Sequence, residues 1–259
     1  MLFSFYSILG LAFVLGACIG SFLNVCIYRI PAGESIVSPP SRCPKCEARI
    51  RWYQNIPLLS WIFLAGKCAA CQSNISVRYP LIEALTGWLF LAVVYYFGLA
   101  WESLIFWVFV SLLVIVTFID LDHQIIPDVI SLPGIVLGFV GSFLIPWVTW
   151  TDSIFGILLG GGSLFLVAAG YELLTKKEGM GGGDIKLLAM LGAFLGWTAV
   201  LPIVFIGSLL GTLVGVPLVL VKGDAGRLRL PFGPFLSAAA VIWLFWGKNL
   251  SSWYFALWH

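Results

Sequence analysis

Two short acidic stretches carry side chains that could hydrolyse a peptide bond. Residues 119–124 contain Asp120 and Asp122 and follow a long apolar run. Residues 179–186 form a glycine-rich stretch that carries Asp184 directly before another apolar run. Ionisable residues at membrane depth are costly, and they are usually functional. Two nearby carboxylates share a proton, so one can activate water while the other protonates a carbonyl oxygen. We therefore predict that Asp120 and Asp184 form the catalytic pair of an aspartyl protease.

Neighbouring residues offer alternative interpretations of both stretches. Asp122 competes with Asp120 for the first catalytic position, although it lies further into a predicted loop and is expected to be solvated. Asp128 follows Pro127 and precedes an apolar run, so we predict that it caps the next helix. Asp184 itself stands where an N-cap would stand, and capping alone is the structural alternative to catalysis at that position.

The cysteines offer a second kind of chemistry. Cys43 and Cys46 form one Cys-x-x-Cys pair, Cys68 and Cys71 form another, and residues 47–67 separate the two. Four thiolates at this spacing are typical of a closed, structural zinc site. Two disulfides or a redox pair are the alternatives. A reducing compartment disfavours disulfides, and a redox pair would not need a second copy. We predict that these four cysteines bind zinc and hold together a segment too small to fold well alone.

The composition of the chain is that of an integral membrane protein. The chain has 259 residues, of which 61% are hydrophobic and 10% are charged, whereas soluble domains carry about 25% charged residues. The apolar segments are continuous over about 20 residues, as in membrane-spanning helices and unlike the alternating strands of a membrane barrel. The sequence therefore predicts an all-α polytopic membrane protein with about eight transmembrane helices and a small, zinc-stapled cytoplasmic insert.

Three regions follow from this pattern. Residues 1–28 form a first transmembrane helix, residues 29–79 form the cysteine-rich insert, and residues 80–259 form a transmembrane aspartyl protease domain. Gly10, Gly16 and Gly20 in the first helix predict close helix packing. The eight helices are expected at residues 2–28, 80–99, 102–119, 129–147, 153–174, 185–197, 200–221 and 235–258.

The basic residues predict the orientation of these helices. With eight helices, one side receives the insert, the loop near Asp120, and the loops at residues 175–184 and 222–234. Those segments, together with Lys186, hold every Lys and Arg except Lys248. Because cytoplasmic loops carry an excess of Lys and Arg, that side is predicted to be the cytoplasm. Both catalytic aspartates and the cysteine insert then face the cytoplasm.

Other function classes fit the sequence less well. His123 and His259 are the only histidines, so a histidine-rich metalloprotease site is excluded, and no P-loop motif is present. The basic residues are typical of positive-inside charge and do not indicate a nucleic-acid partner. An ion-coupled transporter that uses intramembrane aspartates is the main alternative. Against it, both aspartates are predicted at one face of the membrane and not at its midplane.

Several motifs together resemble one known family, the bacterial type IV prepilin peptidases. Asp120 and Asp184 lie in two of them, and the resemblance covers nearly the whole chain. The motifs are Ser21-Phe22-Leu23-Asn24-Val25, Arg29-Ile30-Pro31, Pro40-Ser41-Arg42-Cys43-Pro44-Lys45-Cys46, Asn55-Ile56-Pro57, Tyr79-Pro80-Leu81-Ile82-Glu83, Ile119-Asp120-Leu121-Asp122-His123-Gln124-Ile125-Ile126-Pro127-Asp128, Gly181-Gly182-Gly183-Asp184-Ile185-Lys186-Leu187-Leu188 and Pro231-Phe232-Gly233-Pro234-Phe235.

This resemblance implies a bifunctional enzyme in the bacterial inner membrane. Asp120 and Asp184 match the catalytic pair of these proteases, which share the Gly-x-Gly-Asp form with other intramembrane aspartyl proteases. The family removes the basic leader from type IV prepilins and from the pseudopilins of type II secretion. Many members then methylate the new N-terminal amine with S-adenosylmethionine, and the cysteine insert is typical of these bifunctional members. No residue in the sequence places the S-adenosylmethionine site.

Overall fold

The computed structural model describes residues 2–176, 181–222 and 230–256. Parts of the two predicted cytoplasmic loops, residues 177–180 and 223–229, and the predicted end of the last helix lie outside the described residues. Within the described part, the regular elements are helices, together with two isolated β-bridges in the insert. The predicted all-α fold is therefore confirmed.

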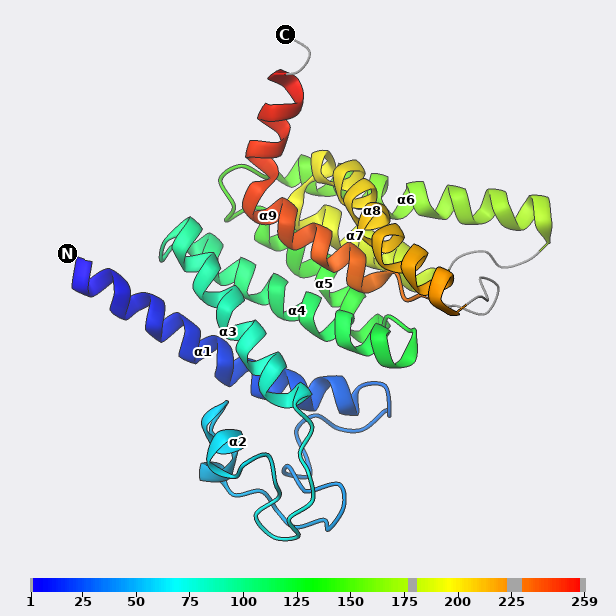
Figure 1. Cartoon of the computed structure of the whole chain (residues 1–259). Helices are drawn as coiled ribbons and strands as arrows, with labels where there is room; N and C mark the ends of the chain where they lie inside the picture. Colours follow the sequence, from blue (N-terminus) through cyan, green and yellow to red (C-terminus); the bar gives the residue numbers. More distant parts are fainter. Residues whose placement is uncertain (1, 177–180, 223–229, 257–259) are drawn as a thin grey trace. The chain divides into compact units, whose positions relative to one another are not determined.

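Eight helices lie outside the insert in the described residues, in the predicted order (Figure 1). They are α1 (Leu2–Arg29), α3 (Arg78–Phe97), α4 (Trp101–His123), α5 (Asp128–Gly141), α6 (Trp150–Thr175), α7 (Gly182–Leu195), α8 (Trp197–Lys222) and α9 (Gly233–Ala256). The insert adds a 3-10 turn, η1 (Trp52–Asn55), and one short helix, α2 (Leu59–Phe63).

Length and composition make five of the described helices able to cross a membrane. These are α1, α3, α4, α6 and α8. Helices α5 and α7 have 14 residues each, which gives a length of about 21 Å. That is shorter than the hydrocarbon core of about 30 Å. The expectation of about eight membrane crossings therefore stays a prediction.

Two predicted helix ends differ from the structure for local reasons. Helix α4 continues past the predicted end at residue 119 and stops at His123, before Gln124 with a φ of +54°. A left-handed residue is a common helix terminator. Helix α5 stops at Gly141, short of the predicted end at residue 147. Pro146 has no backbone N–H and disfavours helical geometry at Ile145, so turns replace the last predicted turns of helix.

The chain forms two compact units, Met1–Ile115 and Val116–His259, with the division inside α4. In the first unit, α1 packs closely along α3. A Cβ atom at Gly16 would come within 2.7 Å of the Thr86 carbonyl oxygen, and one at Gly20 within 2.8 Å of the Glu83 Cα. The predicted close packing is thus present at these two glycines. Gly10, in contrast, borders open space.

Helix α7 forms the core of the second unit. Every residue from 187 to 195 is buried, and the helix contacts α5, α6, α8 and α9. Its closest neighbour is α6, where the backbones of Gly156 and Gly192 touch and a Cβ atom on either residue would collide with the other. Gly196, with a φ of +79°, ends α7, and α8 begins at the next residue. This arrangement fixes the helix that carries Asp184.

Candidate active site

Asp120 lies in the last turn of α4 with only 5% of its surface exposed. The backbone N–H of Gly233, the first residue of α9, donates a hydrogen bond of 2.9 Å to Asp120 Oδ2. A Cβ atom at position 233 would come within 2.6 Å of the same oxygen. Glycine is therefore the residue that lets the start of α9 approach the carboxylate this closely.

Asp184 is the third residue of α7, and Gly181 is the N-cap. The expectation that Asp184 occupies the N-cap position is therefore wrong by three residues, because Gly182 and Gly183 already have helical geometry. With the capping position taken by glycine, the N-cap role that was the alternative to catalysis does not apply to Asp184.

Ile126 lies next to the glycines that neighbour the two aspartates. A Cβ atom at Gly183, next to Asp184, would lie 2.9 Å from the Ile126 Cβ. A Cβ atom at Gly233 would lie 3.4 Å from the Ile126 Cδ1. The start of α7 and the start of α9 thus both border this side chain. Asp184 directly follows Gly183, and Asp120 accepts the hydrogen bond from Gly233, so both aspartates lie beside Ile126. The structure therefore brings the two predicted catalytic residues together.

The other candidates near Asp120 take different positions. Asp122 and His123 are exposed in the last turn of α4, which corrects the expectation that Asp122 lies in a loop. Asp128 is the first residue of α5, whereas Pro127 is its N-cap, so the expected capping role of Asp128 is also wrong.

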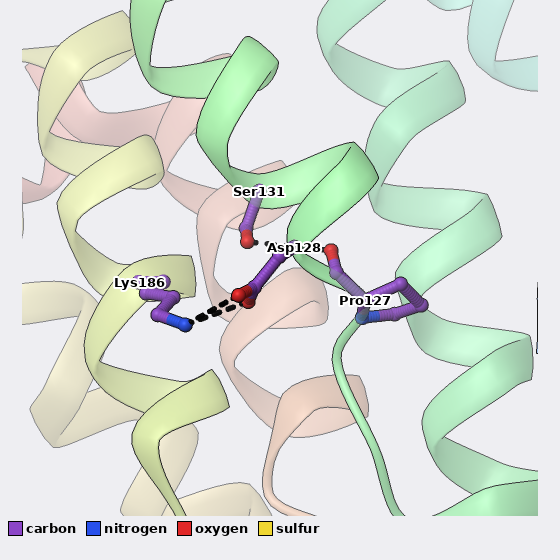
Figure 2. A network of polar contacts seen from close by, with 4 residues as sticks. All are labelled: Pro127, Asp128, Ser131 and Lys186. Carbon is purple, nitrogen blue, oxygen red and sulfur yellow. Dashed lines mark hydrogen bonds and ion pairs between the residues drawn. The ribbon is translucent and has the colours of Figure 1, made fainter.

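The carboxylate of Asp128 instead forms an ion pair with Lys186 (Figure 2). Lys186 Nζ donates to Asp128 Oδ1 at 2.7 Å and to Oδ2 at 2.8 Å. In the same turn, the Ser131 hydroxyl donates to the Pro127 carbonyl oxygen at 3.3 Å. The ion pair joins the start of α5 to the start of α7. Its lysine, Lys186, lies two residues after Asp184. The pair is half-exposed, so it contributes little to the stability of the fold.

The cysteine insert contains the same turn twice, which the sequence analysis did not recognise. Cys43 accepts a backbone hydrogen bond from Glu47 at 2.9 Å, and Cys68 accepts one from Gln72 at 3.0 Å. The residue after the second cysteine of each pair has a positive φ, which is 57° at Glu47 and 59° at Gln72. Each turn is closed by a β-bridge, which pairs Arg42 with Arg49 and Lys67 with Asn74. The signal in the sequence is the pattern Cys-x-x-Cys followed by Glu or Gln.

The four thiols converge at a spacing that suits a tetrahedral metal. All four sulfur atoms lie within 4.8 Å of one another, and Cys43 Sγ is 3.9 Å from Cys71 Sγ. Tetrahedral zinc with bonds of about 2.3 Å separates its sulfur ligands by about 3.8 Å. The backbone N–H groups of Cys46 and Lys45 lower the pKa of the Cys43 thiol to about 6, which favours the thiolate that a metal needs. These residues fit a metal ion, and the zinc identity stays a prediction.

Two family models and several curated relatives match this chain. The family model for the bacterial peptidase A24 N-terminal domain matches residues 14–97, and the model for the type IV leader peptidase family matches residues 107–216. Curated relatives named prepilin leader peptidase/N-methyltransferase are similar along most of the chain. The one from Neisseria gonorrhoeae is 40% identical, covering 94% of this chain and 91% of the relative. The one from Pseudomonas putida is 39% identical, covering 93% and 91%.

A relative with the same name from Myxococcus xanthus is 46% identical over 83% of this chain. The chain matches 64% of that relative's length. No solved structure matches the chain.

Proposed function

The chain belongs to the type IV leader peptidase family, and from this membership we propose that it is a prepilin leader peptidase with N-methyltransferase activity. The single observation that carries the peptidase proposal is that the end of α4 with Asp120 and the start of α7 with Asp184 lie on either side of Ile126. Two carboxyl groups in one partly buried site provide both a base and an acid.

In the proposed reaction the two groups exchange protons with water and the substrate. The ionised carboxylate takes a proton from a water molecule as the water oxygen bonds to the scissile carbonyl carbon. The protonated carboxyl gives its proton to the carbonyl oxygen. When the tetrahedral intermediate collapses, the carbon–nitrogen bond breaks and the leaving nitrogen takes the proton that the first carboxyl group received from water. A hydroxyl group of the intermediate returns its proton to the second carboxylate as the carbonyl re-forms, which restores both groups. The Gly233 N–H keeps the Asp120 carboxylate in one orientation throughout.

The position of the aspartates suggests which bonds they reach. Both lie at helix ends, on the side that the basic residues predict to be cytoplasmic. A type IV prepilin or pseudopilin carries a basic leader before an apolar helix, so its scissile bond would lie at the same interface. We propose cleavage there, by a multi-pass protein of the bacterial inner membrane with its cysteine insert in the cytoplasm.

The methyl-transfer activity rests on the names of the relatives. S-adenosylmethionine would supply the methyl group and the new N-terminal amine would accept it. The described residues do not define a site for this donor, so no methyl-transfer step is assigned to particular side chains. Zinc, when bound by the four cysteines, would supply a structural cross-link and no open coordination position.

Loss of the leader from a purified prepilin tests the peptidase proposal. Detergent-solubilised wild-type protein should convert the prepilin to the mature pilin, and the Asp184→Asn variant should not. A transporter that uses the same aspartates would leave the prepilin intact in both samples. Cleavage by the Asp184→Asn variant at the wild-type rate would instead remove Asp184 from the mechanism.

A further inference from the structure

Helix α2 in the insert has one face that the protein leaves exposed. Leu59, Ile62 and Phe63 follow the spacing of one helix face and are 51%, 63% and 82% exposed. Trp52, in the neighbouring turn η1, is 81% exposed. Four large apolar side chains are thus exposed on η1 and α2.

The other side of α2 packs against the cysteine turns. The Trp61 indole N–H donates to the Ile75 carbonyl oxygen at 3.3 Å. The Trp61 ring also lies against Gly66, where a Cβ atom would come within 3.0 Å of it. Because this inner face already has its partners, the apolar outer face requires a separate explanation.

A buried carboxylate fixes the depth of α2 relative to α3. The Leu58 backbone N–H, directly before α2, donates to Glu83 Oε2 at 2.8 Å. Glu83 is 8% exposed and lies five residues into α3, which begins at Arg78. Five residues of helix correspond to about 7.5 Å of depth. The start of α2 therefore lies beside the first turns of α3, and Figure 1 shows α2 near that end of α3. Since α3 is long and apolar enough to cross a membrane, its first turns would lie near the lipid headgroups.

The charge of the insert matches a lipid surface. Residues 29–79 contain seven Lys or Arg residues and two Glu residues. Arg51 directly precedes η1, and Lys67 follows α2 closely. Basic residues beside an exposed apolar and aromatic face are typical of segments that lie in the interface of an anionic membrane.

We propose that Leu59, Ile62 and Phe63 of α2, with Trp52, insert into the headgroup region of the phospholipid leaflet at this end of α3. The insert is then held at two points, by Glu83 inside the protein and by lipid outside it. This would hold the insert at the membrane surface, with the exposed side of the first cysteine turn, at Lys45, facing water. The inference depends on α3 crossing the membrane and does not depend on the proposed enzymatic activity.

Site-specific quenching by labelled lipids tests this contact in the full-length protein. A fluorescent amino acid is placed at Phe63 in nanodiscs of phosphatidylethanolamine and phosphatidylglycerol that contain doxyl-labelled lipid. Two reference positions are measured in parallel. Leu11, 70% exposed within α1, reports lipid deep in the bilayer, and Lys45, exposed between two of the cysteines, reports the aqueous side.

The label at Phe63 should lose fluorescence to a doxyl group near the headgroup and less to one near the end of the acyl chain. The label at Leu11 should show the opposite order, and the label at Lys45 should lose little to either. Quenching at Phe63 no greater than at Lys45 would overturn the proposal. A photocrosslinker at Ile62 gives a second measurement: crosslinks to lipid support the contact, whereas crosslinks to a second copy of the chain or to a pilin would replace it with a protein interface.

Discussion

Asp120 is buried, and one of its carboxylate oxygens accepts a hydrogen bond from the Gly233 N–H. Asp122, two residues further along α4, is exposed. Replacement of Asp120 or Asp184 by Asn should therefore reduce cleavage at least about a hundredfold, because an amide cannot serve as acid or base. The Asp122→Asn variant is the matched control and should retain most activity. The measurement is the rate of leader loss at equal amounts of inserted protein. Activity lost in the Asp122 variant and kept in the Asp120 variant would reverse the assignment.

Gly233 provides a second prediction at the residue scale. The three atoms nearest to a Cβ atom there belong to the side chains of Asp120 and Ile126, so the Gly233→Ala variant should fold while Asp120 rotates away. We expect kcat for cleavage to fall at least about tenfold with KM little changed, since misplacement of a catalytic group affects the chemical step.

The control for this variant is Gly211→Ala in α8, where the new Cβ atom would lie at an ordinary 3.5 Å from Phe235, near the start of α9. It should cleave at the wild-type rate. If both variants show the same kcat as the wild type, the Gly233 contact does not position Asp120.

Residue type and spacing were enough to predict the two aspartates and the four cysteines as candidates, because carboxylates at membrane depth and paired Cys-x-x-Cys motifs are rare. The contact between Gly233 and Asp120 joins residues 113 positions apart. No local pattern reports such a contact, since it depends on how α4 and α9 pack. The same limit applies to Lys186 and Asp128: the sequence placed Asp128 at a helix start, and only the packing of α5 on α7 shows its partner.

At the scale of elements, the contact between α6 and α7 depends on two glycines. A methyl group on Gly156 would collide with the backbone of Gly192, so the Gly156→Ala variant must separate the helices or strain them. We expect a loss of stability of about 1–3 kcal/mol, together with reduced cleavage because α7 carries Asp184. Thermal unfolding in detergent measures the first effect. Gly162→Ala on the same helix, where the new atom meets open space, should leave both properties unchanged; an equal loss in both variants would contradict this reading.

The ion pair between Asp128 and Lys186 should matter for orientation and little for stability. Half-exposed pairs contribute about 0–1 kcal/mol, so Lys186→Met or Asp128→Asn should barely change thermal unfolding. Cleavage should fall by about three- to tenfold in each, because the pair fixes the first turn of α7. The double variant should be no worse than either single variant, as expected for two residues that act through one contact. Additive losses in the double variant would show that the two side chains act separately.

For the whole molecule, the division into two compact units places the cysteine insert and the aspartates in different parts of the chain. Cys43, Cys46, Cys68 and Cys71 belong to the unit Met1–Ile115, and Asp120 and Asp184 belong to the unit Val116–His259. A closed metal site stabilises mainly the segment that supplies its ligands, and lipid keeps membrane helices folded because their backbone hydrogen bonds are internal. Loss of the metal should therefore disturb the insert first.

This separation predicts different losses in different variants. The Cys43→Ser/Cys46→Ser variant should lose its bound zinc in metal analysis and lose methyl transfer, while part of its prepilin cleavage survives. Asp184→Asn should lose cleavage and keep methyl transfer when an already cleaved pilin is the acceptor. Both activities are measured on both variants after membrane insertion has been checked. An equal loss of both activities in the cysteine variant would mean that the insert also shapes the peptidase site, because a metal confined to one unit would then act on the chemistry of the other.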